Sequence, residues 1–482
     1  MADQPNILMI TSDQQRGDWL RVAGHPLIQT PHIDHLADEG VTFTRGYSEC
    51  PVCIPARYVM MTGLHPETMQ LRANKNVPMP ITETLPYLLG RAGYQTQSVG
   101  KLHFTPQRAC YGFDNTIVCE AGRMPGGDDY HRWLQTTPYA GQERMHGLGN
   151  NMVQSRRSLV PESHHVTTWT VSESLDYLDR RDPTRPFFLY TSFTKPHSPF
   201  DPPAPFDTMY DPDDVPDPYA SDIDPQALPP SLRGLPQTYG WDRLSPAEVR
   251  RIRAHYMGEI SHVDAQIGRL LGGLAWRGLL ENTLVIFTAD HGDMMGDRGL
   301  FFKTTFYEGS MRVPYIMSLP RRWRSRVTGG VVDAPVGLMD LLPTILEAAG
   351  VEDTRPRDGV SLLGFGRGEA PFERRVVHSV YGSTEQDVRH CVTDGVTKYI
   401  WNRRGGMQEM YRPADDPGET RNLAADPANA AELASWRATL VETLQRAGAT
   451  YCLDGDALAA LEAEMPGEAA LRATDRFGRR QF

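Results

Sequence analysis

Short apolar runs that end in polar residues are the feature that most constrains the fold of this chain. The runs cover residues 7–10, 187–190 and 284–287, and each has the length and composition of a buried strand. Helical patterns separate them, at residues 33–39, 84–92, 167–180, 255–274 and 338–349. Strands that alternate with helices predict an α/β fold, with a large, mostly parallel, doubly wound central sheet flanked by helices.

Polar residues follow all three predicted strands. Asp13 ends the first, Lys195-Pro196-His197 follows the second, and Asp290-His291 follows the third. The carboxyl ends of parallel strands meet at one edge of a sheet, where ligands bind. We therefore expect these side chains to face one crevice, although an Asp there could also simply cap a turn or helix.

The pattern changes near Arg374. Short strands are predicted at 376–380 and 398–401, and a helix at 430–445. We predict a catalytic α/β domain at 1–373, an α+β subdomain at 374–453, and a tail at 454–482. The tail could pack on another subunit and form a homo-oligomer. Residues 196–240 are rich in Pro and Asp without periodicity, which is typical of a functional loop or lid.

Composition excludes several partners. The net charge of −11 argues against nucleic acid or an anionic membrane surface. Six cysteines without framework spacing, no apolar run of membrane-spanning length and a polar N-terminus predict a cytoplasmic protein. A trimmed export signal is the alternative.

The segment Cys53-Ile54-Pro55-Ala56-Arg57, closed by Thr62-Gly63, predicts a helix that begins at the cysteine. Pro55 suits a first helical turn, where N–H groups and the helix dipole favour negative charge. Arg57 adds a cation one turn further along. A buried structural cysteine is one alternative. A redox or zinc pair of Cys50 and Cys53 is another, but no second such pair or His pair has zinc spacing.

Cys-x-Pro-x-Arg with a trailing Thr-Gly resembles the signature of the formylglycine-dependent sulfatases, within the alkaline phosphatase superfamily. Ala56 stands where the family usually has Ser. Further resemblances follow in family order at 101–103, 195–197, 255–271, 290–314 and 416–423. The resemblance implies an alkaline-phosphatase-like fold. It also implies that a formylglycine-generating enzyme oxidises Cys53 to formylglycine, whose hydrate is the nucleophile.

The same resemblance implies one divalent metal. Asp13 and Asp290, the carboxylates at two strand ends, are the best ligand candidates, and the resemblance adds Gln14, His291 and an oxygen of the modified Cys53. The commonest family pattern has Asp and Asn where this chain has Gln14 and His291. Oxygen ligands suit Ca²⁺, our first expectation, whereas imidazole also admits Mn²⁺.

The resemblance also assigns the remaining site residues. Arg57 and Lys101 would hold the oxygens of the nucleophile, and His103 would be the base that releases sulfate. His197 and Lys303 would act on the departing oxygen, and Lys195 either contacts substrate or is a surface lysine. We expect Lys101 and His103 to lie on an extended segment and therefore to point to one side.

The sequence thus predicts a hydrolase of sulfate monoesters that acts on a small-molecule or carbohydrate sulfate ester. The alternative is a phosphonate monoester or phosphodiester hydrolase of the same superfamily, whose members share Gln and His at the metal positions but generally lack Lys-x-His. A non-catalytic binding protein with unconverted Cys53 is a third possibility. The alcohol part stays open between sugar, aryl and choline.

Overall fold

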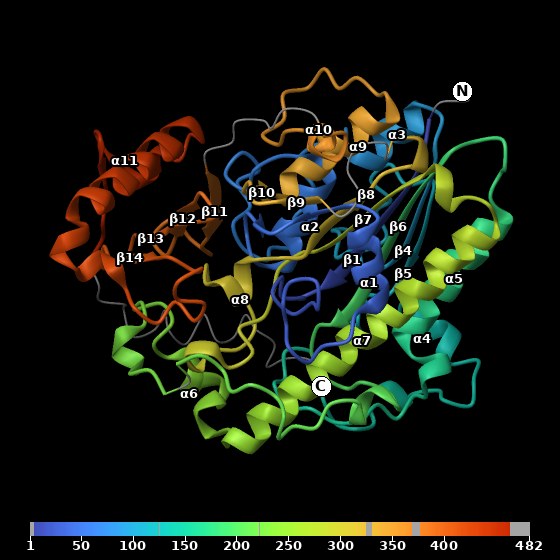
Figure 1. Ribbon diagram of the computed structural model, residues 1–482, viewed down its shortest axis with the longest axis horizontal. Helices are drawn as coiled ribbons and strands as arrows, with labels where there is room; N and C mark the ends of the chain where they lie inside the picture. The colour runs from blue at the N-terminus through green and yellow to red at the C-terminus, as the bar shows by residue number, and fades with distance from the viewer. Residues whose placement is uncertain (1–3, 125, 221, 324–329, 369–375, 463–482) are drawn as a thin grey trace.

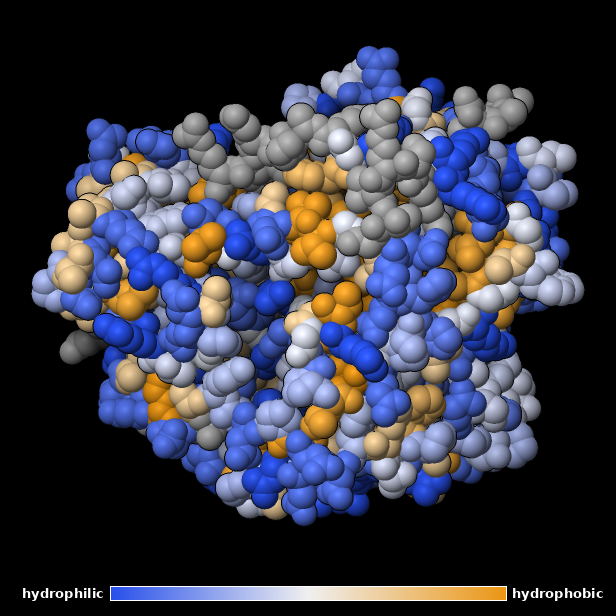
Figure 2. Space-filling model, in the orientation of Figure 1, coloured by the Kyte–Doolittle hydropathy of each residue, from blue (hydrophilic) through white to orange (hydrophobic). Residues whose placement is uncertain are grey.

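The computed structural model describes residues 4–124, 126–220, 222–323, 330–368 and 376–462. Figure 1 shows a large part with helices on both faces of one sheet and a smaller C-terminal part with its own sheet. The predicted α/β class with a separate C-terminal α+β unit is therefore confirmed. Figure 2 shows polar side chains spread over one face, with apolar groups in separate small clusters.

The central sheet has eight strands in the order β5-β4-β6-β1-β7-β8-β2-β9. Their bounds are β1 (Asn6–Asp13), β2 (Val41–Phe43), β4 (Gln95–Gly100), β5 (Asn115–Val118), β6 (Phe187–Pro196), β7 (Thr283–Ala289), β8 (Tyr315–Ser318) and β9 (Gly330–Val332). The strands from β5 to β7 are parallel, and β8 is antiparallel to both of its neighbours. The three strands predicted from sequence are β6, β1 and β7, at the centre of the sheet.

Strand β1 is buried on both faces, which explains its continuous apolar run. Ile7 and Met9 join the core shared with helices on one face, whereas Leu8 and Ile10 join the core on the other face. The first face carries α2 (Cys53–Thr62), α3 (Leu85–Arg91) and α9 (Leu341–Ala349), and the second carries α1 (Pro31–Asp38), α5 (Val166–Arg180) and α7 (Pro246–Trp276). Each such side chain contributes roughly 1.5–3 kcal/mol through burial.

Strand register brings the predicted polar residues together. Ser12 pairs with Ala289, so Asp13 and Asp290 leave adjacent strands at the same edge. On the other side of β1, Asp13 pairs with Pro196.

Gly100 ends β4 with φ 104°, and a Cβ there would lie 1.9 Å from the Ser192 carbonyl oxygen. Only glycine fits at this close approach of β4 to β6.

Helix α7 is longer than the predicted range 255–274. It begins after Ser245, whose side chain forms a capping box with Glu248, and Pro246 occupies the first turn. The prediction missed residues 246–254 because the first turns are largely exposed or half-buried and therefore lack an apolar stripe. Within 196–240, the only α-helix that the structure describes is α6 (Leu235–Tyr239), and Tyr210 and Leu228 are buried in a core shared with α7.

The C-terminal sheet is antiparallel, in the order β11 (Val377–Tyr381), β12 (Arg389–Thr393), β13 (Lys398–Asn402) and β14 (Gln408–Tyr411). Helix α11 (Ala430–Arg446) packs on it through Leu440 and Leu444. The predicted boundary at 373/374 lies outside the described residues, as does most of the predicted tail. Its described start forms a hairpin, β15 (Leu453–Asp454) with β16 (Ala457–Leu458), and Leu461 bridges to Arg404.

The remaining short elements lie around the sheet edges. They are β3 (Gly46–Tyr47), β10 (Val336–Gly337), α4 (Asp129–Leu134), α8 (Glu308–Met311) and α10 (Leu363–Gly366). Among the helices described, none combines the length and apolar character needed to cross a membrane.

A buried ion-pair network joins the two parts. Lys398 of β13 is fully buried, and its Nζ lies 2.7 Å from carboxylate oxygens of both Glu308 and Glu419. Glu308 begins α8 in the large part. A buried cation between two carboxylates fixes how the C-terminal sheet meets that helix.

We expect Lys398→Met to lower the free energy of unfolding by about 3–5 kcal/mol, because it leaves two buried carboxylates without their cation. Urea unfolding followed by tryptophan fluorescence measures the change. The control is Arg421→Met, which removes an exposed partner of Asp426 at 3.6 Å and should change stability by less than about 1 kcal/mol. Equal effects of the two variants would contradict the role of the network.

Candidate active site

Helix α2 begins at Cys53 under the carboxyl edge of the sheet. Val52 is extended and gives no side-chain cap, Pro55 lies in the first turn, and Gly63 ends the helix with φ 62°. The Ile54 N–H donates to Asn74 Oδ1 at 2.9 Å. Cys53 is 1% exposed. The predicted cysteine at a helix N-terminus is therefore present, and it is buried.

Arg57 ties α2 to the strand ends. Its Nε donates to Asp290 Oδ2 at 3.0 Å, and its Nη1 donates to the Lys101 carbonyl oxygen at 2.7 Å and Ser192 Oγ at 2.9 Å. Nη2 lies 3.8 Å from Asp13 Oδ2. Three strands are thus linked to one turn of helix by a buried guanidinium, which holds Cys53 beside both carboxylates.

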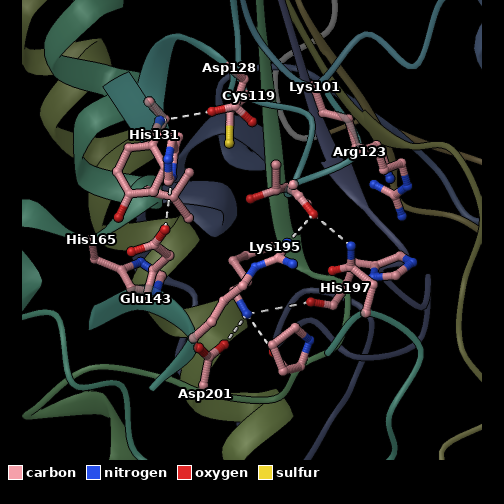
Figure 3. Close-up of a pocket in the computed structure, with 18 of the residues that line it drawn as sticks. Lys101, Cys119, Arg123, Asp128, His131, Glu143, His165, Lys195, His197 and Asp201 are labelled. Atoms are coloured by element: carbon pink, nitrogen blue, oxygen red, sulfur yellow. Dashed lines mark hydrogen bonds and ion pairs between the residues drawn. The ribbon is translucent and has the colours of Figure 1, made fainter. Parts of the chain in front are cut away.

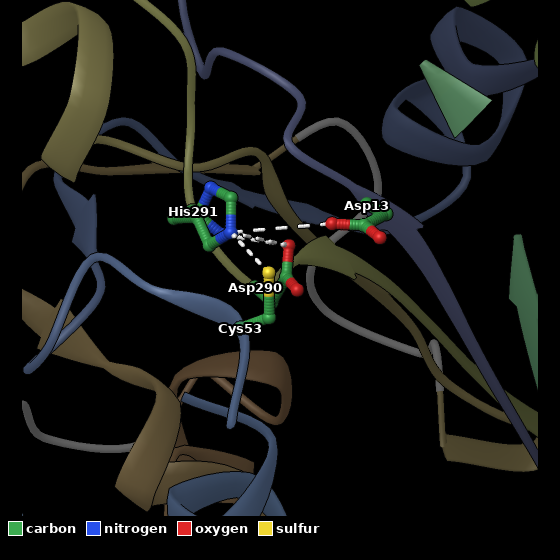
Figure 4. A group of neighbouring side chains, drawn as sticks. All are labelled: Asp13, Cys53, Asp290 and His291. Atoms are coloured by element: carbon green, nitrogen blue, oxygen red, sulfur yellow. Dashed lines mark hydrogen bonds and ion pairs between the residues drawn. The ribbon is translucent and has the colours of Figure 1, made fainter. Parts of the chain in front are cut away.

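Four predicted metal ligands gather at one point. One ligand atom each of Asp13, Cys53, Asp290 and His291 lies within 4.8 Å of all the others, and all four residues are buried. Figure 4 shows the His291 ring with its Nε2 directed at the others. This atom is 3.3 Å from Cys53 Sγ, 3.7 Å from Asp290 Oδ1 and 3.9 Å from Asp13 Oδ1.

The group fits a divalent cation. Asp13 Oδ1 is buried without a hydrogen-bond partner, which a bound cation would supply. His291 Nδ1 lies 3.0 Å from the Gly292 carbonyl oxygen, so Nδ1 carries the proton and the Nε2 lone pair faces the group. Two carboxylates and an imidazole are ordinary ligands for a divalent metal.

Gln14, the other predicted ligand, lies next to this group. Its backbone is left-handed, with φ 68°, and its N–H donates to Asp290 Oδ1 at 3.0 Å. Its Nε2 donates to Asp293 Oδ2 at 2.6 Å, and its Oε1 accepts from Lys303. Asp293 therefore sets the direction of the amide. Sequence reasoning missed this residue, although it stands three positions after Asp290.

The predicted cations line the other side. Lys101 pairs with Asp13, and Lys303 Nζ lies 2.8 Å from His197 Nε2. His103 and His197 both lie close enough to Cys53 for that residue to influence the pKa of each imidazole. The structure thus brings together all the residues predicted to be catalytic; the role of each stays a prediction.

The expected extended segment at Lys101–His103 is wrong in detail. His103 has φ 57°, and the N–H groups of Leu102 and His103 both donate to Glu120 Oε1, at 3.1 and 2.9 Å. The two hydrogen bonds to this buried carboxylate hold the backbone in its left-handed turn, and the imidazole remains close enough to Cys53 for that residue to influence its pKa. Nothing in the sequence near Glu120 pointed to this role.

Electrostatics favour negative charge on residue 53. Burial alone would raise the pKa of the Cys53 thiol, but Lys101 and Lys303 hold it well below its usual range. The pKa of Asp13 is also lowered, because Lys101 outweighs its burial. Burial lowers the pKa of His103 and of His197 to about 3, so both imidazoles are neutral at pH 7.

Lys195, the predicted substrate contact, is buried rather than on the surface. Its Nζ contacts Asp201 and lies 2.8 Å from Glu259 Oε1. It lines the pocket described next, but its charge is already neutralised.

A pocket of about 300 Å³ opens above the site, from Asp13, Lys101 and His197 outward to α4 and residues 141–150. Figure 3 shows Lys101, Arg123 and His197 along one side, with His131, Glu143 and His165 along the opposite side. Arg123 is not among the site residues predicted from the sequence.

This fold and site define an ester hydrolase of the alkaline-phosphatase-like class, and comparisons with known proteins agree. The family model "Sulfatase" matches residues 5–351, and the model "N-sulphoglucosamine sulphohydrolase, C-terminal" matches residues 296–446. The chain belongs to the sulfatase family and is a sulfuric ester hydrolase.

Individual relatives cover most of the chain. It is 33% identical to an arylsulfatase of Clostridium perfringens over 87% of this chain and 90% of the relative. It is 28% identical to a choline-sulfatase of Rhizobium meliloti, over 88% and 83%. The phosphonate monoester hydrolase structure of Agrobacterium radiobacter is similar with a TM-score of 0.81 and 26% identity, covering 93% of this chain and 96% of that one.

We expect Asp13→Ala and Asp290→Ala each to weaken metal binding by roughly tenfold or more, because each removes a charged ligand. Elemental analysis after dialysis against equal Ca²⁺ and Mn²⁺ measures the occupancy and the preferred ion. The control is Asp128→Asn, whose carboxylate accepts the N–H groups of Glu120 and His131 instead. Full occupancy in both alanine variants would show that these carboxylates are not ligands.

Proposed function

We propose that this chain hydrolyses sulfate monoesters to sulfate and an alcohol, with a formylglycine derived from Cys53 as nucleophile and one divalent cation. The proposal rests on the residues that surround Cys53. A residue with 1% exposure at a helix N-terminus faces Lys101, Lys303 and two histidines in a protein of net charge −11. Such a local reversal of charge suits an anionic ester.

The chain's own residues divide the work. Asp13, Asp290, His291 and residue 53 would hold the cation, with Gln14 adjacent; the cation would withdraw charge from the bound anion. Arg57 is fixed by Asp290 and Ser192 and so positions α2 rather than moving during turnover. Lys101 lies beside residue 53 and can hold its oxygens.

The two neutral imidazoles suit proton transfer at opposite ends of the reaction. His103 lies near residue 53, since that residue influences the pKa of the imidazole, and His103 can accept a proton there. His197 contacts Lys303 at 2.8 Å, and this pair can supply a proton and positive charge to the departing alcohol oxygen.

We infer calcium as the cation, with manganese as the alternative that His291 favours. We further propose that a formylglycine-generating enzyme matures the chain, that the substrate is a small-molecule or carbohydrate sulfate ester, and that neither nucleic acid nor a membrane is a partner. The described cysteines are all free, which supports a cytoplasmic location. We also propose that the chain forms a homo-oligomer through its tail, most of which lies outside the described residues.

The second candidate function is hydrolysis of phosphonate monoesters or phosphodiesters. Gln14 and His291 favour it, and so does the similarity to the phosphonate monoester hydrolase structure. Lys101 and His103 favour the sulfatase, because they place a cation and a base beside residue 53.

We expect Cys53→Ala to lower kcat/KM for 4-nitrophenyl sulfate by roughly a thousandfold or more, because the nucleophile is lost. The matched control is Cys50→Ala. Cys50 is also buried, but its Sγ contacts the Arg72 carbonyl oxygen at 3.5 Å instead of the site. Mass spectrometry of the peptide that holds residue 53 should show the aldehyde in the parent and in the control. Near-normal turnover by Cys53→Ala would rule out the mechanism.

Comparison of matched 4-nitrophenyl esters separates the two candidate functions. We expect kcat/KM for the sulfate to exceed that for the phenylphosphonate and the phosphodiester, because Lys101, His103, His197 and Lys303 surround the nucleophile. An advantage of more than about tenfold (~1.4 kcal/mol) for either phosphorus ester would favour the second candidate.

A further inference from the structure

The pocket above the site is poor in aromatic rings. Among its lining residues that the structure describes, Tyr130 is the only Phe, Tyr or Trp, and it is 7% exposed with its hydroxyl bonded to the His164 carbonyl oxygen at 3.1 Å. Aryl groups stack on aromatic rings, and quaternary ammonium groups bind in cages of them. Apart from the imidazoles of His131, His165 and His197, the described wall offers little surface of either kind.

Polar atoms with spare hydrogen-bonding capacity face the same pocket. Glu143 Oε1 lies 3.0 Å from His131 Nδ1, whereas Glu143 Oε2 is buried without a partner. His165 uses Nδ1 to accept the Thr167 N–H at 3.3 Å, which leaves its Nε2 for another partner. Buried polar atoms require partners, and the hydroxyl groups of a sugar both donate and accept.

Arg123 adds a positive charge that has no direct ion pair with a carboxylate of the described residues. Its Nη1 donates to the Glu120 carbonyl oxygen at 3.2 Å, and its charge also acts on the nearby buried Glu120 carboxyl. Lys195, by contrast, contacts two carboxylates in the same pocket. Arg123 lies close enough to the site for its charge to act on both His103 and Lys101. An unpaired guanidinium beside an anion-binding site is suited to a second anion.

We propose that the substrate is a sulfated sugar with a second anionic group, a carboxylate or another sulfate, and that Arg123 binds this group. The inference rests on the proposed sulfatase function and deepens it. Lys101 and the residues around Cys53 receive the sulfate that is cleaved, the polar wall at Glu143 and His165 receives hydroxyl groups, and Arg123 determines specificity for the second charge.

Matched sugars test the proposal. The 2-, 3- and 4-O-sulfates of methyl glucoside and of methyl glucuronide differ only at C6, which is a hydroxymethyl group in the glucoside and a carboxylate in the glucuronide. Released sulfate is measured by ion chromatography. At the position that is cleaved, we expect the glucuronide to have the higher kcat/KM by about tenfold or more, the usual strength of a charge-assisted hydrogen bond. Methyl glucoside disulfates test whether a second sulfate serves equally well.

Arg123→Gln should abolish this preference, so that kcat/KM for the glucuronide falls by about tenfold or more relative to kcat/KM for the glucoside and for 4-nitrophenyl sulfate, neither of which has a second anionic group. The control is Arg108→Gln, which removes the same charge from a residue paired with Asp129 at 2.9 Å outside the pocket. It should keep the preference. Thermal melting shows whether both variants fold.

The possible results distinguish failure of the Arg123 proposal from failure of the proposed sulfatase function. Equal loss on all sulfate esters in Arg123→Gln would mean that Arg123 binds the sulfate being cleaved, which overturns the inference. A parent enzyme that shows no preference for the sugars with a second anionic group also overturns it, while sulfatase activity stands. A converted parent that cleaves no sulfate ester overturns the proposed function itself.

Discussion

The contact between Arg57 and the ends of β1, β6 and β7 is the interaction on which the site depends. The parallel register places Asp13 and Asp290 side by side and buries both. Two adjacent buried carboxylates would repel each other strongly and favour protonation. Arg57 reaches both of them and the neighbouring Ser192 from α2, and Lys101 contacts Asp13. The same guanidinium therefore reduces the repulsion between the two buried carboxylates and fixes Cys53 beside them.

Acidic and basic side chains lie close together around residue 53. Carboxylates and His291 surround one side of residue 53, whereas Lys101, Lys303, His103 and His197 surround the other. A divalent cation would sit on the acidic side and a bound anion on the basic side, so each would lower the cost of burying the other. Asp293 and Glu120 support the two sides by holding Gln14 and the 102–103 backbone.

Most of the architecture could be predicted from the sequence. The three central strands, six of the helices and the polar strand ends with Asp13 and Asp290 have strong local patterns, and the resemblance supplied the formylglycine at Cys53 and the roles of Gln14 and His291. The rest depends on contacts distant in sequence. The left-handed backbone at His103 follows from Glu120, the direction of the Gln14 amide from Asp293, and the exposed first turns of α7 from Ser245 capping. Arg123 has no signal of its own, because only the folded pocket shows that it lacks a carboxylate partner.

The order of the strands along the chain determines when the central sheet can form during synthesis. Strand β1 occupies the centre of the sheet, yet its partner β7 begins at Thr283 and its other partner β6 at Phe187. Contacts of such long range form late in folding, and a chain made from its N-terminus must wait for both. Until then α2 has no sheet edge to pack under, and Cys53, later inaccessible to any large catalyst, is still exposed. Because the sheet closes late, there is a period during synthesis in which another protein can reach and chemically modify the side chain at position 53.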